Sequence, residues 1–113
     1  MHVYNVHTPD EGSYFYLMIA YHPRRREVRL AKLAAPHLRS NKRTLSVALF
    51  ERYVRGAYAT TPAALRQKTK KRLSAWYTSP EFIKERLALL TPWYKRAGAV
   101  RYELPASVKV KPL

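Results

Sequence analysis

The sequence Ser13-Tyr-Phe-Tyr-Leu-Met-Ile-Ala-Tyr21 has apolar or aromatic side chains at every position after the first. Successive side chains of a strand point to opposite faces, so a strand formed here would be apolar on both. Such a pattern is typical of a central strand that is covered on each side. The run is also much shorter than the roughly 20 apolar residues needed to cross a bilayer. We therefore expect a buried strand here, with the rest of a sheet around it.

Turn signals on each side of this strand predict a β-meander. Residues 2–7 can form a preceding strand, and Pro9-Asp-Glu-Gly12 is a turn in which Pro fixes φ and Gly accepts positive φ. A second turn at His22-Pro-Arg-Arg25 leads to residues 26–33, where apolar and polar residues alternate. We expect three antiparallel strands over residues 1–34.

The following part of the chain, residues 40–97, has helical patterns. Apolar residues at helical spacing predict a core helix over residues 42–58, and Thr-Pro at the start of residues 61–77 predicts a second helix. Residues 78–90 begin with a capping box and a proline, which predicts a third helix. A fourth, short helical turn is expected over residues 91–96. The sequence therefore predicts three to four helices.

The C-terminal part predicts a return to the sheet. Residues 99–104, Ala-Val-Arg-Tyr-Glu-Leu, are expected to form a last strand that rejoins the sheet, and residues 105–113 an extended tail. Strands, then helices, then one strand is the order of an α+β fold with segregated layers. Since 113 residues is the length of one ordinary domain, we expect a single domain over residues 1–113.

The charge of the chain points to a polyanionic partner. The sequence has 22 Lys and Arg against 7 Asp and Glu, which gives a formal net charge of +15. Such an excess destabilises a free protein by self-repulsion, and nucleic acid is the partner that most commonly neutralises it. Because 47% of the residues are hydrophobic, the chain is expected to fold by itself, unlike a disordered basic tail.

Other classes of site find little support in the sequence. There is no cysteine, which excludes disulfides, thiolate zinc sites and a cysteine nucleophile. The four histidines lack metal-binding spacing, and the three glycines form no phosphate-binding loop. The N-terminus lacks a signal-peptide pattern. We expect no cofactor, no metal and no membrane partner, and an intracellular location in the cytoplasm, nucleoid or a virion. Homo-oligomerisation is left open.

Three basic clusters form the expected contact surface. The strongest is in the predicted second helix, where residues 66–72 hold five cations and no acid, whereas solvated faces normally mix signs. The second is the hairpin tip, since a β-ribbon can enter a groove. The third begins the predicted core helix, where the helix dipole disfavours cations unless an anion binds. The candidate nucleic-acid-binding residues are Arg66, Lys68, Lys70, Lys71 and Arg72; Arg24, Arg25 and Arg26; and Arg39, Lys42 and Arg43.

Two further hypotheses use aromatic and titratable residues. Tyr14 and Tyr16 share one face of the central strand and could stack on bases. Tyr16 could also converge with His22, Glu27 and His37 near the hairpin, as a small metal-independent nuclease would require. Nothing in the spacing of these residues demands that chemistry.

The sequence therefore predicts a non-enzymatic, weakly sequence-specific nucleic-acid-binding protein with an architectural, packaging or regulatory role, in chromatin or a virus. DNA is marginally preferred to RNA. An RNA-binding component of a ribosome or ribonucleoprotein is the alternative within this class, and a small nuclease is the alternative from another. The Gly-rich aromatic signature of RNA-recognition motifs and the Gly-x-x-Gly clamp are both absent.

Overall fold

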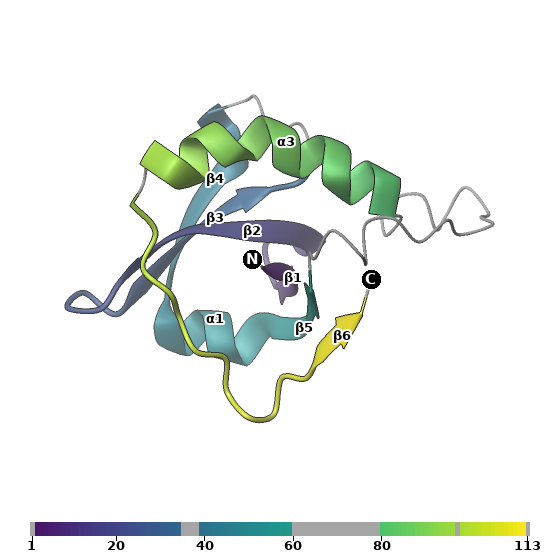
Figure 1. Ribbon diagram of the computed structural model, residues 1–113. Coiled ribbons are helices and arrows are strands. Elements are labelled where there is room, and N and C mark those ends of the chain that lie inside the picture. The colour runs from purple at the N-terminus through teal and green to yellow at the C-terminus, as the bar shows by residue number, and fades with distance from the viewer. Residues whose placement is uncertain (1, 35–38, 60–79, 97, 113) are drawn as a thin grey trace.

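The computed structural model describes residues 2–34, 39–59, 80–96 and 98–112. Most of the strands lie in the first half of the chain, and a long helix follows in the second half (Figure 1). The elements are β1 (His2–Thr8), β2 (Gly12–His22), β3 (Glu27–Lys32), the 3-10 turn η1 (Arg39–Asn41), β4 (Lys42–Ser46), α1 (Val47–Tyr53), β5 (Val54–Ala59), α3 (Pro80–Arg96) and β6 (Val110–Pro112).

All six described strands form one mixed sheet in the order β4-β3-β2-β1-β5-β6. The first four strands follow one another as antiparallel neighbours, β5 returns to pair with β1, and β6 adds to β5 in parallel. The predicted α+β class is confirmed, and β2 lies inside the sheet as its sequence indicates. β1, β2 and β3 also pair in the antiparallel order expected for residues 1–34.

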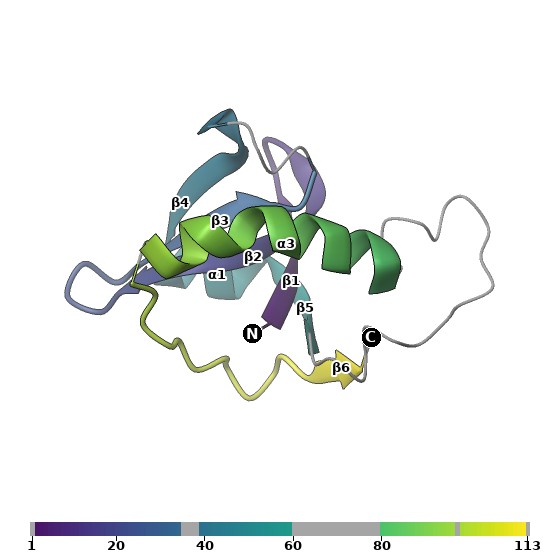
Figure 2. The ribbon, with the colours of Figure 1, turned by 45° about the horizontal axis from the view of Figure 1, so that its top comes forward.

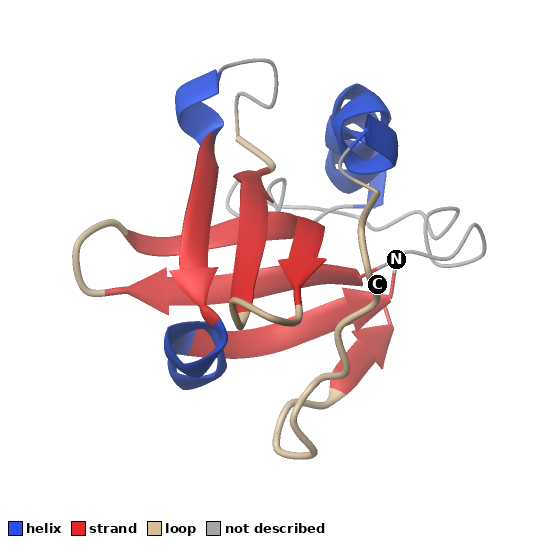
Figure 3. Cartoon of the chain, turned by 90° about the vertical axis from the view of Figure 1, so that its left-hand side faces the viewer, coloured by secondary structure: helices blue, strands red, loops and turns tan. Residues whose placement is uncertain are grey.

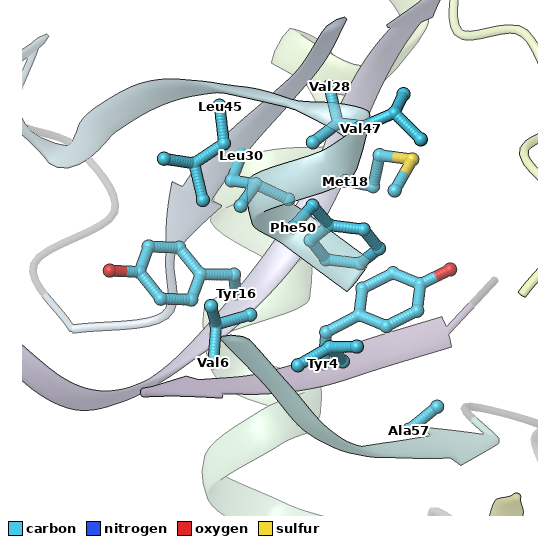
Figure 4. Close-up of a cluster of buried hydrophobic side chains, with 11 residues drawn as sticks. Tyr4, Val6, Tyr16, Met18, Val28, Leu30, Leu45, Val47, Phe50 and Ala57 are labelled. Atoms are coloured by element: carbon cyan, nitrogen blue, oxygen red, sulfur yellow. The ribbon is translucent and has the colours of Figure 1, made fainter. Parts of the chain in front are cut away.

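The two faces of the sheet carry separate hydrophobic cores. Tyr16 and Met18 of β2 point into a core that is closed by Phe50 of α1, and Figure 4 shows this ring between Tyr4 and Met18. Leu17 alternates with them and belongs to a second core beneath α3. Figure 3 shows the strands between the two helices. The sequence of β2 is apolar on both faces because each face is covered.

The helix predicted over residues 42–58 is wrong, because this stretch folds as β4, α1 and β5. Leu45 is buried while its neighbours Thr44 and Ser46 are exposed, which is the alternation of a strand. Ser46 is in an extended conformation and caps α1, since its hydroxyl accepts a hydrogen bond from the Leu49 backbone N–H at 3.2 Å. The β-branched Val54 then ends the helix in an extended conformation and starts β5.

Two predictions for the C-terminal part are also wrong. α3 continues through Pro92 to Arg96, without the break that the sequence predicts before residue 91. Pro92 has no N–H to donate to the Ala88 carbonyl, and both residues are exposed, so that water can donate to this carbonyl instead. Residues 99–104 form no strand. The strand that joins the sheet is β6, in the predicted tail, and Tyr102 packs against the core by its side chain.

Candidate nucleic-acid interface

The arginines of the second predicted cluster lie at the tip of the β2–β3 hairpin. His22 and Glu27 form the last strand pair, and Arg24, Arg25 and Arg26 are exposed in the turn between them. Figures 1 and 2 both show this hairpin projecting from the body at the left edge. The cluster is therefore presented on a protruding β-ribbon, as the sequence predicts.

Arg26 has an unusual backbone for its residue type. Its φ of 51° lies in the left-handed region, where a non-glycine residue costs about 1 kcal/mol or more. The side chain is exposed, so no burial offsets that cost. A left-handed residue commonly closes a hairpin loop, and Arg26 here is the last residue of the turn before β3.

The hairpin also carries a shallow concave surface. His22, Pro23, Arg24 and Arg25 line an open hollow of about 400 Å³. Arginine offers five N–H donors in a planar fork that matches phosphate oxygens, and histidine can add one more donor. The tip therefore combines positive charge with a surface into which a phosphate group can fit.

A second group of cations lies on the α3 side of the sheet. Arg29 and Lys42 share this face on the adjacent strands β3 and β4, because Arg29 pairs with Thr44 and Lys42 pairs with Ala31. Burial lowers the pKa of Lys42, and the charges of Arg29 and Arg96, the last residue of α3, lower it further. Lys42 is therefore close enough to Arg29 and to Arg96 to be repelled by both, and a bound anion would reduce that repulsion.

Arg43 lies on the other face of β4 and is engaged by the protein itself. Its Nη2 donates to both carboxylate oxygens of Asp10 at 3.0 and 2.9 Å, and its Nη1 lies 3.3 Å from Thr8 Oγ1 and 3.0 Å from Glu11 Oε1. The hydrogen bond from Arg43 lowers the pKa of Asp10. Lys32 pairs with the other oxygen of Glu11. This network ties β4 to the β1–β2 turn, and the phosphate contact expected of Arg43 stays a prediction.

The two turns that flank β2 thus differ in charge. β2 has 11 residues, which at about 3.3 Å per residue places its two turns roughly 35 Å apart along the strand. At the first turn, Asp10 and Glu11 neutralise Arg43 and Lys32. At the second turn, the arginines face solvent. The hairpin end of β2 is therefore the more positive of the two ends of this strand.

The base-stacking hypothesis for Tyr14 and Tyr16 is wrong for Tyr16, which is 0% exposed. Tyr14 is partly exposed, packs edge-on against Tyr16 with 6.4 Å between ring centroids, and has the Lys32 ammonium 4.4 Å above its ring. Tyr16 therefore belongs to the core, and one face of Tyr14 is occupied by a lysine.

Replacing Tyr16 with Phe is expected to stabilise the protein by about 1 kcal/mol, since the buried Tyr16 hydroxyl has the Arg43 guanidinium nearby but makes no hydrogen bond of good geometry with any described residue. Burial, followed by the charge of Glu11, raises the pKa of Tyr16 to about 12. Between pH 10 and 12 the unfolded tyrosine ionises while the native one stays neutral, so stability falls as pH rises. This fall should be smaller in the variant, as measured by urea denaturation across that range.

Tyr14→Phe is the matched control, because it removes a hydroxyl from a partly exposed ring of the same strand and should change stability by less than about 0.5 kcal/mol. A loss of stability in Tyr16→Phe would show that its hydroxyl is hydrogen-bonded in solution, and would contradict the prediction.

Of the residues named in the nuclease hypothesis, one pair lies side by side in the described part of the chain. His22 and Glu27 are directly paired across the end of the hairpin, whereas Tyr16 is buried and His37 lies outside the described residues. Over residues 2–34, 39–59, 80–96 and 98–112, no group of three His, Cys, Asp or Glu side chains could hold a metal ion. Catalysis by this pair stays a hypothesis from the sequence.

The remaining predicted contacts are only partly described. Arg39 begins η1, three residues before Lys42 in the chain. Arg66, Lys68, Lys70, Lys71 and Arg72 lie outside the described residues. The sequence alone does not indicate Arg29 and Arg96 as neighbours of Lys42. Arg29 stands out only as a polar position in a strand, and no local signal places Arg96 near it.

Comparisons with protein-family models, with curated proteins and with solved structures give no match to this chain. None of the described helices combines the length and the apolar character that a membrane crossing requires. The function is therefore inferred from the chain's own residues.

Proposed function

We propose that this chain is a nucleic-acid-binding protein that recognises the phosphate backbone mainly by charge, with the β2–β3 hairpin tip in the interface. The observation that carries the proposal is the separation of charge along β2. Internal ion pairs neutralise cations at the β1–β2 turn, while three consecutive arginines are exposed at the other end. A net charge of +15 supplies the long-range attraction.

Duplex DNA is the ligand that we propose for this surface. The major groove of B-form DNA is about 12 Å wide and accepts a two-stranded β-ribbon, whereas the major groove of duplex RNA is too narrow and deep for side chains. The cations on Arg29, Lys42 and Arg96 can contact phosphates beside the groove that the hairpin enters. We also include the five cations of residues 66–72 in the proposed interface, and this inclusion rests on the sequence alone.

The proposed role is architectural or regulatory, with weak sequence preference. Contacts to phosphates fix position but carry no direct sequence information. A packaging protein should bind unrelated duplexes with similar affinity, whereas a regulator should prefer its own site by several kcal/mol. The same measurement with duplex RNA separates the DNA proposal from an RNA-binding role.

Replacing Arg24, Arg25 and Arg26 with Gln is expected to weaken duplex binding and to reduce the slope of log K against log salt by up to about 3, or about 1 for each phosphate that an arginine no longer neutralises. The measurement is fluorescence anisotropy of a labelled duplex between 50 and 200 mM NaCl, a range over which six to ten phosphate contacts cost about 10³ to 10⁵ in affinity.

The matched control replaces Arg55, Lys109 and Lys111 with Gln. These cations are also exposed but belong to β5 and the neighbourhood of β6, and their removal lowers the net charge by the same three units. The control should keep most of the wild-type slope. Equal reductions in the two variants would show that total charge matters and the hairpin does not, which would overturn the proposed interface.

A further inference from the structure

A cleft of about 720 Å³ opens at the end of the sheet, between the first residues of β1, the end of α3 and residues 99–104. This is within the size range of small-molecule sites in proteins. Its polar and aromatic lining comes from His2, Tyr4, Tyr94, Arg101, Tyr102 and Glu103. Nothing in the interface described above uses these residues.

The aromatic walls of the cleft are held in place by the core. Tyr4 is 5% exposed, and its ring meets Phe50 edge-on with 5.3 Å between centroids. Tyr102 packs against Phe50 at 5.8 Å, and its hydroxyl donates a hydrogen bond to Glu51 of α1. Tyr94 at the end of α3 is half-buried. Fixed aromatic rings offer a planar ligand a surface at little entropic cost.

The polar groups of the cleft differ in charge. Arg101 and Glu103 flank Tyr102 and are both exposed, so a cation and a carboxylate stand at the mouth. Burial lowers the pKa of His2, and the charge of Arg101 adds to that effect. At neutral pH the imidazole therefore offers one donor and one acceptor. Burial raises the pKa of Tyr4 to about 12, which keeps its phenol neutral.

One side chain of the cleft lining also contacts the base of the basic hairpin. The ring of Tyr102 packs against Tyr21, with 5.0 Å between centroids, and Tyr21 directly precedes His22 of the hairpin hollow. Figure 1 shows the chain after α3 passing the base of the hairpin on its way to β6. The base of the hairpin and the lining of the cleft are therefore in contact through this ring pair.

We propose that this cleft binds one unstacked nucleotide, with the base against the half-buried rings of Tyr94 and Tyr102 and the phosphate on Arg101. This inference rests on the proposed nucleic-acid binding and specifies a second mode for it. Base edges carry N–H donors and carbonyl or ring-nitrogen acceptors, for which Glu103 and the neutral His2 are complementary. The nucleotide can be free or can belong to a single strand, and the chemistry of recognition is the same.

The test uses the full chain with adenosine 5′-monophosphate, adenosine and a single-stranded oligonucleotide, each titrated by calorimetry. Arg101→Gln is expected to weaken binding of the monophosphate by about tenfold and to leave adenosine binding unchanged, because only the phosphate is held by this residue. Lys109→Gln is the control, since Lys109 is an exposed cation that does not line the cleft. It should change neither affinity by more than about twofold.

Tighter binding of the oligonucleotide than of the monophosphate, with the same weakening in Arg101→Gln, would assign the cleft to a single strand. Equal affinities would assign it to free nucleotides. Absence of saturable binding by all three probes, or equal effects of the two variants, would overturn the inference. If duplex binding still depends on the hairpin arginines in that case, the proposed function survives. If that dependence is also absent, both proposals fail.

Discussion

Replacing Phe50 with Ala is expected to lower the free energy of unfolding by about 3 to 5 kcal/mol, the range observed when a large buried ring is removed and leaves a cavity. Phe50 is 0% exposed and meets the rings of Tyr4 and Tyr102 at 5.3 and 5.8 Å. It joins α1 to the sheet and to residues 98–104 at one point. Urea denaturation of the wild type and the variant measures the difference.

Phe50→Leu is the matched control, because it keeps most of the apolar volume and removes the ring pairs. Its cost should be about 1 to 2 kcal/mol. A cycle with Tyr102→Leu should give a coupling of about 0.5 to 1.5 kcal/mol between the two rings. A destabilisation below about 1 kcal/mol for Phe50→Ala would contradict the packing of α1 on this core.

The central strand could be predicted because its signal is local. Every position from Tyr14 to Tyr21 is apolar or aromatic, and the strand is bounded by one turn with Pro and Gly and by a second turn with Pro. A strand with two apolar faces needs a cover on each side, and α1 and α3 supply these covers. The sheet around β2, the α+β class and the β2–β3 hairpin can all be predicted from that single pattern.

The stretch from 42 to 58 could not be predicted in the same way. Its buried side chains are Leu45, Val47, Phe50, Val54 and Ala57, at spacings of two, three, four and three residues. Most of these spacings are those of a helix, yet they arise from a strand, a seven-residue helix and a second strand in succession. The strand pairings that decide the outcome join this stretch to β3 and β1, and β1 lies far away in the sequence.

The proposed binding surfaces also divide into one that could be predicted from the sequence and two that could not. The hairpin arginines were predictable because turn and cluster occupy the same few residues. The group of Arg29, Lys42 and Arg96 and the nucleotide cleft were not, because each combines distant parts of the chain. Positions that the sequence marks only as polar become a site when the sheet order brings them together.

Replacing Lys68, Lys70, Lys71 and Arg72 with Ala is expected to reduce the salt slope of duplex binding by up to about 4, the largest effect on affinity that we predict. The reason is the density of charge in this segment, which has five cations and no acid over residues 66–72. Folding should be retained, as circular dichroism would show. The matched control replaces Arg52, Arg55, Lys109 and Lys111, four exposed cations, and also lowers the net charge by four.

Combining these four substitutions with those of the three hairpin arginines distinguishes one interface from two. If both clusters contact the same duplex, the reductions in slope should add to up to about 7, because each phosphate contact releases its own counterions. If they bind alternative sites, removal of either cluster should leave the slope set by the other, and only the combined variant should fail to bind. An unchanged slope after the four substitutions would exclude residues 66–72 from the interface and leave the hairpin as its centre.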